Sequence, residues 1–193
     1  MVETIRKPPL SLEASLSTLI VCDLQTRLLP VIHQSERIVR RVEVLVQAAA
    51  SWPIPIIATE QYPEKLGSTI ESLQSSCTQV LPKFEFSGWS ALNWKPAHDS
   101  AVERTQIVLC GIESHICILQ TALDLLAQGY QVFVPYDATG SYRPEDVQWA
   151  LQRMMQAGAT IVSTESVLFE WCQSSKAPQF KTISQLIKST RGD

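Results

Sequence analysis

The sequence predicts one α/β domain over residues 1–193: a three-layer α/β/α arrangement around a doubly wound, mostly parallel sheet of about six strands. Short apolar runs alternate with longer amphipathic segments along the chain, which is typical of a sheet whose strands are joined by helices. Such connections imply parallel pairing through right-handed crossovers. A length of 193 residues suits a single domain, with residues 1–16 and 189–193 expected as flexible tails.

The expected strands are short apolar runs. Residues 17–23 (STLIVCD) form the first, and residues 106–111 (QIVLCG) are the clearest. Residues 80–84 are a weaker candidate because Pro82 cannot donate a backbone hydrogen bond. The remaining strands are expected at 55–59, 131–135 and 160–163.

The expected helices have apolar residues at spacings of three and four. Residues 35–50 show this spacing with Ser35 as the expected N-cap, and the same spacing runs from Ser114, also an expected N-cap, to Gly129. A third long helix is expected from Pro144, a residue favoured in the first helical turn, to Gly158. Shorter helices are expected at 70–74, after Thr164 and at 182–188.

Composition limits the classes of function. Hydrophobic residues make up 45% of the chain and charged residues only 18%, so a filled core is expected rather than disorder. The formal net charge of −3 provides no general attraction for nucleic acid or an anionic membrane, and neither is expected as a partner. The apolar runs are far too short to cross a bilayer.

The five cysteines contain no CxxC pair, and the three histidines do not complete a zinc-binding spacing. No metal and no cofactor are therefore expected. Cys22 and Cys110 lie inside apolar runs, where a reduced cysteine behaves as a small hydrophobic residue. A cytoplasmic location is expected from this use of cysteine.

Three chemically reactive residues follow three different expected strands. In an open parallel sheet, ligands bind outside the carboxyl ends of the strands, near the point where the strand order reverses. Asp23 ends the first strand, Lys83 lies in the strand at 80–84, and Cys117 comes after the strand at 106–111. An acid, a lysine and a cysteine are therefore expected on one rim of the sheet.

These three residue types suit nucleophilic catalysis. Cys117 lies about one turn into its expected helix, where free backbone N–H groups and the helix dipole favour a thiolate and can hold an oxyanion. A nearby Lys83 favours the thiolate further, and Asp23 can take the thiol proton and return it to a leaving group. Taken singly, such residues are more often a turn residue, a solvated charge and an inert thiol.

Several sequence segments resemble the isochorismatase-like cysteine hydrolases. They are LIVCDLQ (19–25), LPKFEFSGW (81–89) and VLCGIESHICILQTALDLLAQGYQVFVPYDATGS (108–141), and the resemblance runs from about residue 17 to 188. TEQYPEKLG (59–67) and APQFKTISQLIK (177–188) are most similar to the branch of isochorismatase domain-containing proteins.

The resemblance implies a doubly wound sheet and a catalytic triad of Asp23, Lys83 and Cys117, which coincides with the residues found from the strand ends. It also implies a cis peptide between Ile112 and Glu113. The backbone N–H groups of Glu113 and Cys117 would then stabilise the oxyanion.

Two departures from the family narrow the expected chemistry. Nicotinamidases bind a metal through a D-x-H motif after the second strand, where this chain reads Thr59–Glu60–Gln61–Tyr62. The metal site therefore looks absent, which disfavours a nicotinamidase. Isochorismatases proper do not use a cysteine nucleophile, so Cys117 argues against isochorismate as the substrate.

The favoured function is a cysteine hydrolase that cleaves a C–N bond (amide, carbamoyl or ureido) or an ester of a small molecule through a thioester-type intermediate. One alternative is a binding or scaffold protein that keeps the fold without turnover. Another is a redox sensor, although no resolving cysteine is evident because Cys110 lies within its strand. A homo-oligomer is expected from the resemblance. The candidate substrate-pocket residues are Gln25, Tyr62, Phe84, Trp89, Ser114 and Tyr142.

Overall fold

A computed structural model describes residues 11–190, and in this part of the chain seven strands form one sheet. The sheet order is β3-β2-β1-β4-β5-β7, with β6 beside β4, and every pair is parallel. The predicted fold class is confirmed, and the strand beyond the expected six is the two-residue β6. The strands are β1 (Ser17–Cys22), β2 (Ile56–Gln61), β3 (Gln79–Lys83), β4 (Gln106–Ile112), β5 (Gln131–Pro135), β6 (Thr139–Gly140) and β7 (Thr160–Val162).

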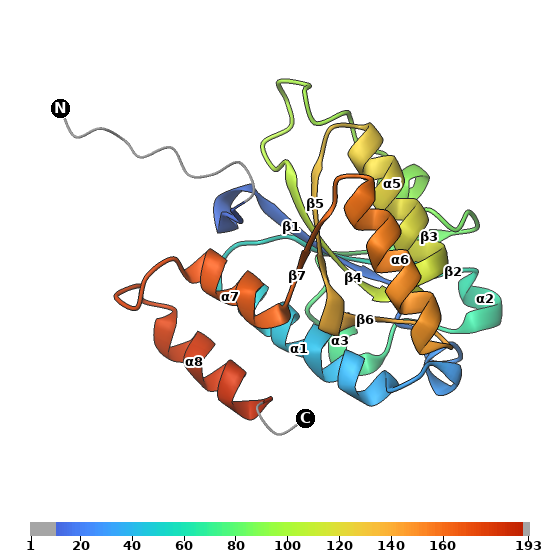
Figure 1. Cartoon of the computed structure of the whole chain (residues 1–193), viewed down its shortest axis with the longest axis horizontal. Helices are drawn as coiled ribbons and strands as arrows, with labels where there is room; N and C mark the ends of the chain where they lie inside the picture. The colour runs from blue at the N-terminus through green and yellow to red at the C-terminus, as the bar shows by residue number, and fades with distance from the viewer. Residues whose placement is uncertain (1–10, 191–193) are drawn as a thin grey trace.

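Helices cover both faces of the sheet, which gives three layers (Figure 1). One face carries α1 (Ser35–Ser51), α3 (Glu71–Gln74), α7 (Thr164–Cys172) and α8 (Phe180–Ser189). The other face carries α4 (Trp89–Leu92), α5 (Leu119–Ala127) and α6 (Pro144–Gln156). The short elements are α2 (Pro63–Leu66), η1 (Ala14–Leu16), η2 (Leu29–Val31), the π-helical turn η3 (Ser114–Ile118) and η4 (Tyr136–Ala138). No helix among these described elements is long and apolar enough to span a membrane.

The central strands are apolar because both of their faces are covered. All six residues of β1 and all seven of β4 are buried. Successive side chains of a strand point to opposite faces. Leu19 and Val21 therefore join the core beneath α1, whereas Ile20 and Cys22 join the core beneath α5. Continuous apolar runs rather than alternating ones follow from this arrangement.

The described part of the N-terminal segment packs against the domain. The side chain of Leu12 is 1% exposed. The backbone N–H of Leu12 donates to Glu170 Oε2 at 2.7 Å, and that of Glu13 donates to Gln106 Oε1 at 2.7 Å. The expectation of a flexible tail over residues 1–16 is therefore wrong for residues 11–16. Packing of this segment depends on one apolar side chain, Leu12, and one residue gives no periodic pattern in the sequence. At the other end α8 continues to Ser189, and the tails expected at residues 1–10 and 191–193 lie outside the described residues.

The carboxyl ends of β1 and β4 lie side by side at the point where the strand order reverses. Gly111 of β4 is paired with Cys22 of β1 and has a φ of +115°, in the region that favours glycine. A Cβ atom at Gly111 would overlap the backbone carbonyl oxygen of Cys22. Glycine at this position therefore lets the two strand ends approach each other closely.

Candidate active site

The three residues proposed as catalytic follow three strands that end on the same edge of the sheet. Asp23 comes directly after β1, Lys83 is the last residue of β3, and Cys117 lies in η3, just beyond β4. Strand β2 separates β3 from β1, but the Lys83 side chain reaches across it. The Lys83 Nζ lies 2.7 Å from Asp23 Oδ2.

Asp23 is a buried carboxylate whose two oxygens have different partners. The residue is 0% exposed, and its φ of 52° is left-handed, a conformation that aspartate tolerates better than most residues. Thr59 Oγ1 donates to Oδ1 at 2.7 Å. Apart from the ion pair with Lys83, Oδ2 has no hydrogen-bond partner within residues 11–190. This oxygen can therefore accept a proton from a neighbouring group.

Lys83 carries a buried positive charge that its surroundings stabilise. Its Nζ donates to Gln61 Oε1 at 2.6 Å and to the backbone carbonyl of Phe86 at 3.1 Å. Burial alone would lower the pKa of the Lys83 ammonium. The neighbouring Cys22, Asp23 and Cys117 outweigh that effect and raise the pKa above its ordinary value. The ammonium therefore stays charged at neutral pH.

Cys117 is the most exposed of the three residues, at 7%. It belongs to the same buried cluster beneath α5 as Cys22. The neighbouring Cys117 thiol, burial and the charge of Asp23 raise the pKa of the Cys22 thiol, although Lys83 opposes them. Cys22 is therefore a neutral thiol next to the candidate nucleophile. From the sequence alone, Cys22 was expected only as a small buried residue.

The turn that carries Cys117 differs from the expected capped α-helix. Its first residues form the π-helical turn η3, a type of irregularity frequent at functional sites. Ser114 is not the N-cap, because its Oγ lies 3.0 Å from Thr139 Oγ1 in a buried hydrogen bond. The Glu113 carbonyl accepts from the N–H groups of Ile116 and Ile118 at 3.1 and 3.2 Å.

The peptide between Ile112 and Glu113 is cis, at the position where the sequence resemblance places a cis bond. The Glu113 carboxylate accepts from the backbone N–H of Tyr142 at 2.9 Å. No acceptor for the backbone N–H of Glu113 occurs among the described residues. That N–H group is free to donate to a ligand.

Exposed aromatic side chains surround the end of β3. Tyr62 and Phe84 make an edge contact with ring centroids 5.2 Å apart, and both are exposed. Phe86, which the sequence analysis did not select, is also exposed and its carbonyl binds Lys83. Tyr142 is exposed near Glu113, and the guanidinium of Arg143 lies 6.0 Å from its ring centroid.

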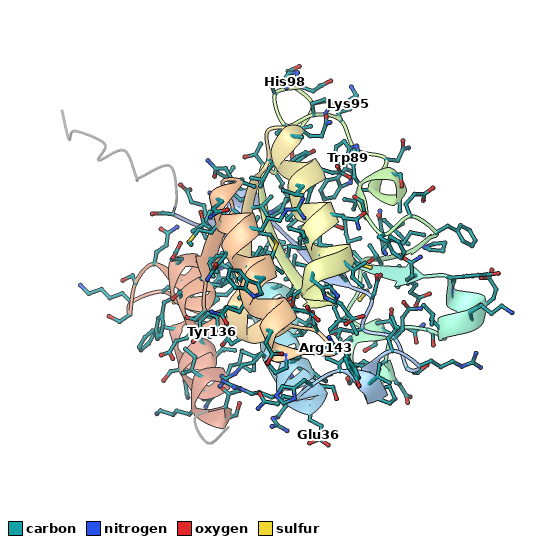
Figure 2. All side chains as sticks on the ribbon, turned by 45° about the vertical axis from the view of Figure 1, so that its right-hand side comes forward. Glu36, Trp89, Lys95, His98, Tyr136 and Arg143 are labelled. Atoms are coloured by element: carbon teal, nitrogen blue, oxygen red, sulfur yellow. The ribbon has the colours of Figure 1, made fainter. Side chains whose placement is uncertain are left out.

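The other expected pocket residues belong to the framework. The amide of Gln25 donates to the backbone carbonyls of Gln61 and Gly67 at 3.0 and 2.6 Å, and its oxygen accepts from Gln61 N. Trp89 stacks obliquely on Tyr130, with centroids 6.1 Å apart. Figure 2 shows Trp89 far from Arg143, the neighbour of Tyr142. Gln25, Ser114 and Trp89 are therefore held by contacts within the protein, whereas Tyr62 and Phe84 are exposed.

The last three residues of β2 are occupied by contacts within the protein. Thr59 binds Asp23, Gln61 binds Lys83, and Glu60 Oε1 accepts from both the N–H and the hydroxyl of Thr69. Within residues 11–190, no group of three or more histidine, cysteine or acidic side chains could hold a metal ion. The neutral amide of Gln61 therefore accepts a hydrogen bond from the Lys83 ammonium.

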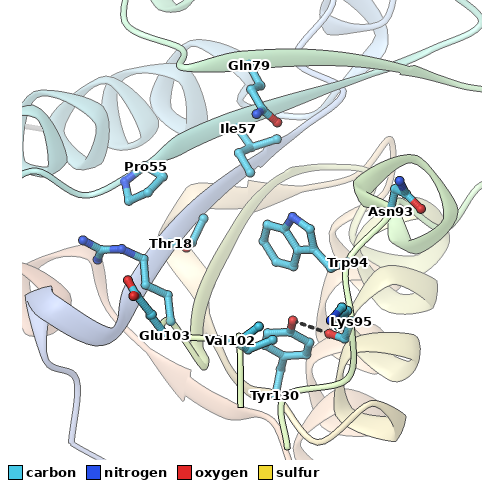
Figure 3. A pocket seen from close by; sticks show the side chains of 12 residues that line it. Thr18, Pro55, Ile57, Gln79, Asn93, Trp94, Lys95, Val102, Glu103 and Tyr130 are labelled. Atoms are coloured by element: carbon cyan, nitrogen blue, oxygen red, sulfur yellow. Dashed lines mark hydrogen bonds between the residues drawn. The ribbon is translucent and has the colours of Figure 1, made fainter. Parts of the chain in front are cut away.

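A separate cavity of about 460 Å³ lies at the opposite edge of the sheet, next to the amino ends of β1, β2 and β3 (Figure 3). Trp94, Tyr130 and Ile57 are among the residues that line it. None of the candidate catalytic residues reaches this cavity. The chemistry expected at the carboxyl edge is therefore spatially distinct from it.

Comparison with known proteins gives the family. The isochorismatase domain matches residues 17–166 of this chain. The chain belongs to the isochorismatase family. Mouse isochorismatase domain-containing protein 2A is 39% identical over 172 residues, covering 89% of this chain and 82% of its own length. A secreted isochorismatase effector of Phytophthora sojae, Isc1, is 36% identical over 177 residues, covering 89% and 84%.

Solved structures share the isochorismatase fold. The MAR1 ribonuclease of Caenorhabditis elegans has a TM-score of 0.84 and 34% identity, with 92% of each chain covered. The Escherichia coli YcaC protein, an octameric hydrolase of unknown specificity, has a TM-score of 0.83 and 21% identity over 96% of this chain and 95% of its own. The second likeness concerns the fold alone.

Proposed function

We propose that this isochorismatase-family protein is a cysteine hydrolase that cleaves a small amide, carbamoyl, ureido or ester substrate. The observation that carries the proposal is the buried Asp23–Lys83 pair, with its 2.7 Å contact, on the edge of the sheet that also carries Cys117. A carboxylate, a stabilised ammonium and a thiol are the groups that acyl transfer to sulfur requires.

In the proposed first half-reaction, Asp23 Oδ2 takes the thiol proton and the Cys117 sulfur attacks the carbonyl carbon. The carbonyl π electrons move to oxygen, where the N–H groups of Glu113 and Cys117 stabilise the anion. The C–N or C–O bond then breaks, and Asp23 returns the proton to the leaving nitrogen or oxygen. The product is a thioester on Cys117.

In the second half-reaction, Asp23 takes a proton from water, which attacks the thioester carbon. The C–S bond breaks, and the acid product leaves with the thiol restored. Lys83 keeps its charge throughout, so it stabilises the carboxylate, the thiolate and the oxyanion in turn. Cys117 is the most exposed of the three residues, so the substrate is expected to approach from its side.

The first test is the reactivity of each cysteine towards iodoacetamide as a function of pH, read by mass spectrometry. We expect Cys117 to react fastest near neutral pH, with a profile that changes in Asp23→Asn and is absent in Cys117→Ala. Cys77 and Cys172 provide the internal comparison. Equal reactivity of Cys117 and these two thiols would contradict a primed nucleophile and would favour the scaffold alternative.

A substrate screen over small amides, ureido compounds and esters then tests turnover. We expect the Cys117→Ala and Asp23→Asn variants to lose hydrolysis of any true substrate, while Cys172→Ser retains it. An RNA oligonucleotide belongs in the screen because a similar protein is the C. elegans MAR1 ribonuclease. With a net charge of −3 we expect no cleavage of RNA, and Cys117-independent cleavage would overturn the proposal.

We also propose that the protein self-associates and works in the cytoplasm. Trp149 and Met155 on α6 are 66% and 57% exposed, an unusual display of large apolar side chains, and the E. coli YcaC protein is octameric. All five cysteines are free, which suits a reducing compartment. Light scattering of the purified protein tests the assembly, and a monomer at micromolar concentration would contradict it.

A further inference from the structure

The turn η3, which carries Cys117, is tied to a second segment of the chain, the bracing segment at residues 139–142. Its first two residues are the strand β6, which pairs with the end of β4 so that Thr139 lies opposite Gly111. The next two residues lead into α6. The bracing segment holds none of the three candidate catalytic residues, so its contacts with η3 need another explanation.

Buried hydrogen bonds form a chain from η3 through the bracing segment to the end of β4. The Thr139 hydroxyl donates to the backbone carbonyl of Gly111 at 3.1 Å, because a carbonyl oxygen can only accept. A hydroxyl has a single proton, so Ser114 Oγ, 3.0 Å away, must be the donor to Thr139 Oγ1. Ser114 and Thr139 are 0% and 4% exposed, so a group that loses its partner here has no easy access to water. The Thr139 hydroxyl is therefore the link on which the chain depends.

Two further contacts tie the neighbours of Ser114 to the bracing segment. The backbone N–H of Tyr142 donates to Glu113 Oε2 at 2.9 Å. The imidazole Nδ1 of His115 lies 3.0 Å from the Ser141 hydroxyl oxygen. Three consecutive residues directly after β4 are thus each bound to the bracing segment.

We propose that Thr139 is a positioning residue of the hydrolase: through Ser114 it fixes η3, and with it the thiol and backbone N–H of Cys117, in the geometry that the reaction needs. The inference rests on Cys117 being the nucleophile of the proposed function, but not on any particular substrate. The Thr139 hydroxyl is bound on both sides within the protein, so it acts on the reaction only through the turn.

The turn needs outside contacts because of its own geometry. A π-helix is rare and occurs mostly as single turns, and η3 is such a turn. Inside it, one acceptor serves two donors: the Glu113 carbonyl binds the N–H groups of both Ile116 and Ile118. Misplacement of a reacting group by about 1 Å can slow a reaction about 100-fold. Contacts that hold η3 in place therefore bear directly on the rate at Cys117.

The experiment compares four variants of the full-length protein. Thr139→Val keeps the shape of the side chain but leaves both Ser114 and the Gly111 carbonyl without a partner. Thr139→Ser keeps the hydroxyl, and Ser114→Ala removes only the link to η3. The matched control is Thr164→Val, because Thr164 is 2% exposed and its hydroxyl donates at 3.0 Å to Asp137 instead of to the turn.

The first measurement is amide hydrogen exchange by NMR, which does not depend on the reactivity of Cys117. In Thr139→Val and Ser114→Ala we expect the N–H groups of Ile116 and Ile118 to exchange at least about tenfold faster than in the wild type. In Thr139→Ser and Thr164→Val we expect exchange of these two groups at the wild-type rate.

The second measurement is the alkylation of Cys117 by iodoacetamide as a function of pH. In Thr139→Val and Ser114→Ala we expect the midpoint of this profile to rise by about one pH unit, because the displaced turn moves the thiol relative to the Lys83 ammonium. The rate at pH 7 then falls about tenfold, while the plateau at high pH, which reports access, does not fall. Thr139→Ser restores the midpoint. A general loss of stability would expose the thiol and raise the plateau without moving the midpoint.

The outcomes separate this inference from the proposed function. Unchanged exchange in Thr139→Val, or equal acceleration in Thr164→Val, overturns the inference and leaves the hydrolase proposal standing. Faster exchange with an unchanged alkylation midpoint does the same, because the contacts would then stabilise the turn without positioning the thiol. If Thr139→Val does not fold, Ser114→Ala decides by the same two criteria. A wild-type Cys117 that is no more reactive than Cys77 overturns the proposed function itself, and the positioning role with it.

Discussion

Removing one partner of the Asp23–Lys83 pair should destabilise the protein far more than removing both charges. The proposed perturbations are Lys83→Met, Asp23→Asn and the double variant. In the wild type the Lys83 and Asp23 side chains are 0% and 1% exposed, and the charged atoms lie 2.7 Å apart. Neither charge can recover solvation in the folded state once its partner is lost.

The magnitude follows from the contacts of each side chain. A buried charge left without its partner costs about 3–5 kcal/mol. Lys83→Met also leaves the acceptors on Gln61 and Phe86 without a donor, at about 1 kcal/mol each. The double variant keeps this second cost but has no unpaired charge. Each single variant leaves one unpaired charge and the double variant leaves none, so the coupling energy between the two substitutions should be at least about 6 kcal/mol.

The assay is urea unfolding at pH 7, followed by tryptophan fluorescence and circular dichroism, with the free energy of unfolding extrapolated to water. Lys83→Met should also lower the Tm by about 10 °C. If the two single changes add to the double change within about 0.5 kcal/mol, the pair is not energetically coupled and the reasoning fails. If Lys83→Met does not fold, a double variant that does fold still demonstrates the coupling.

Three further predictions concern the framework around the site. Gly111→Ala should cost at least about 3 kcal/mol of stability, because its φ of +115° is strained for alanine and its Cβ would overlap the backbone of Cys22. Gly158→Ala is the control: its φ is +109° but its Cβ would lie 3.9 Å from the nearest side chain, so equal losses in urea unfolding would refute the steric argument. Leu12→Ala should cost about 2–5 kcal/mol, and no loss would show that residues 11–16 do not pack. The raised pKa of Cys22 favours its neutral form in the folded state, so this contribution is complete below the ordinary thiol pKa of 9.0 and is lost as pH rises through the folded value. Unfolding free energies measured from pH 7 upwards should fall above about pH 9, and less steeply in Cys22→Ala.

The sequence predicted the sheet well because its strands are apolar runs with helices between them. The runs at 17–23 and 106–111 lie within one residue of β1 and β4. The two-residue strand β6 has no such signal, since it pairs only at the end of β4. Leu12 was missed for a related reason: one apolar residue makes a buried contact without making a pattern.

The candidate site was predicted in part. The placement of Asp23, Lys83 and Cys117 at strand ends depends only on where strands stop, which periodicity reveals. The position of Cys22 near η3 depends instead on β1 lying beside β4, which pairs Cys22 with Gly111, and strand order was not predicted. The contact of Trp89 with Tyr130 was not predicted, because the two residues are far apart in the sequence.

The strand order divides the chain into two contiguous halves. Strands β1, β2 and β3 come from residues before the loop at 93–105, and β4 to β7 come from residues after it, so the halves meet along the β1–β4 pairing. Asp23 and Lys83 belong to the first half and Cys117 to the second. Two fragments cut in that loop would each carry an incomplete set of reactive groups. Only their reassociation would restore it, so the chain is suited to serve as a split reporter in which the return of thiol reactivity signals that the halves have met.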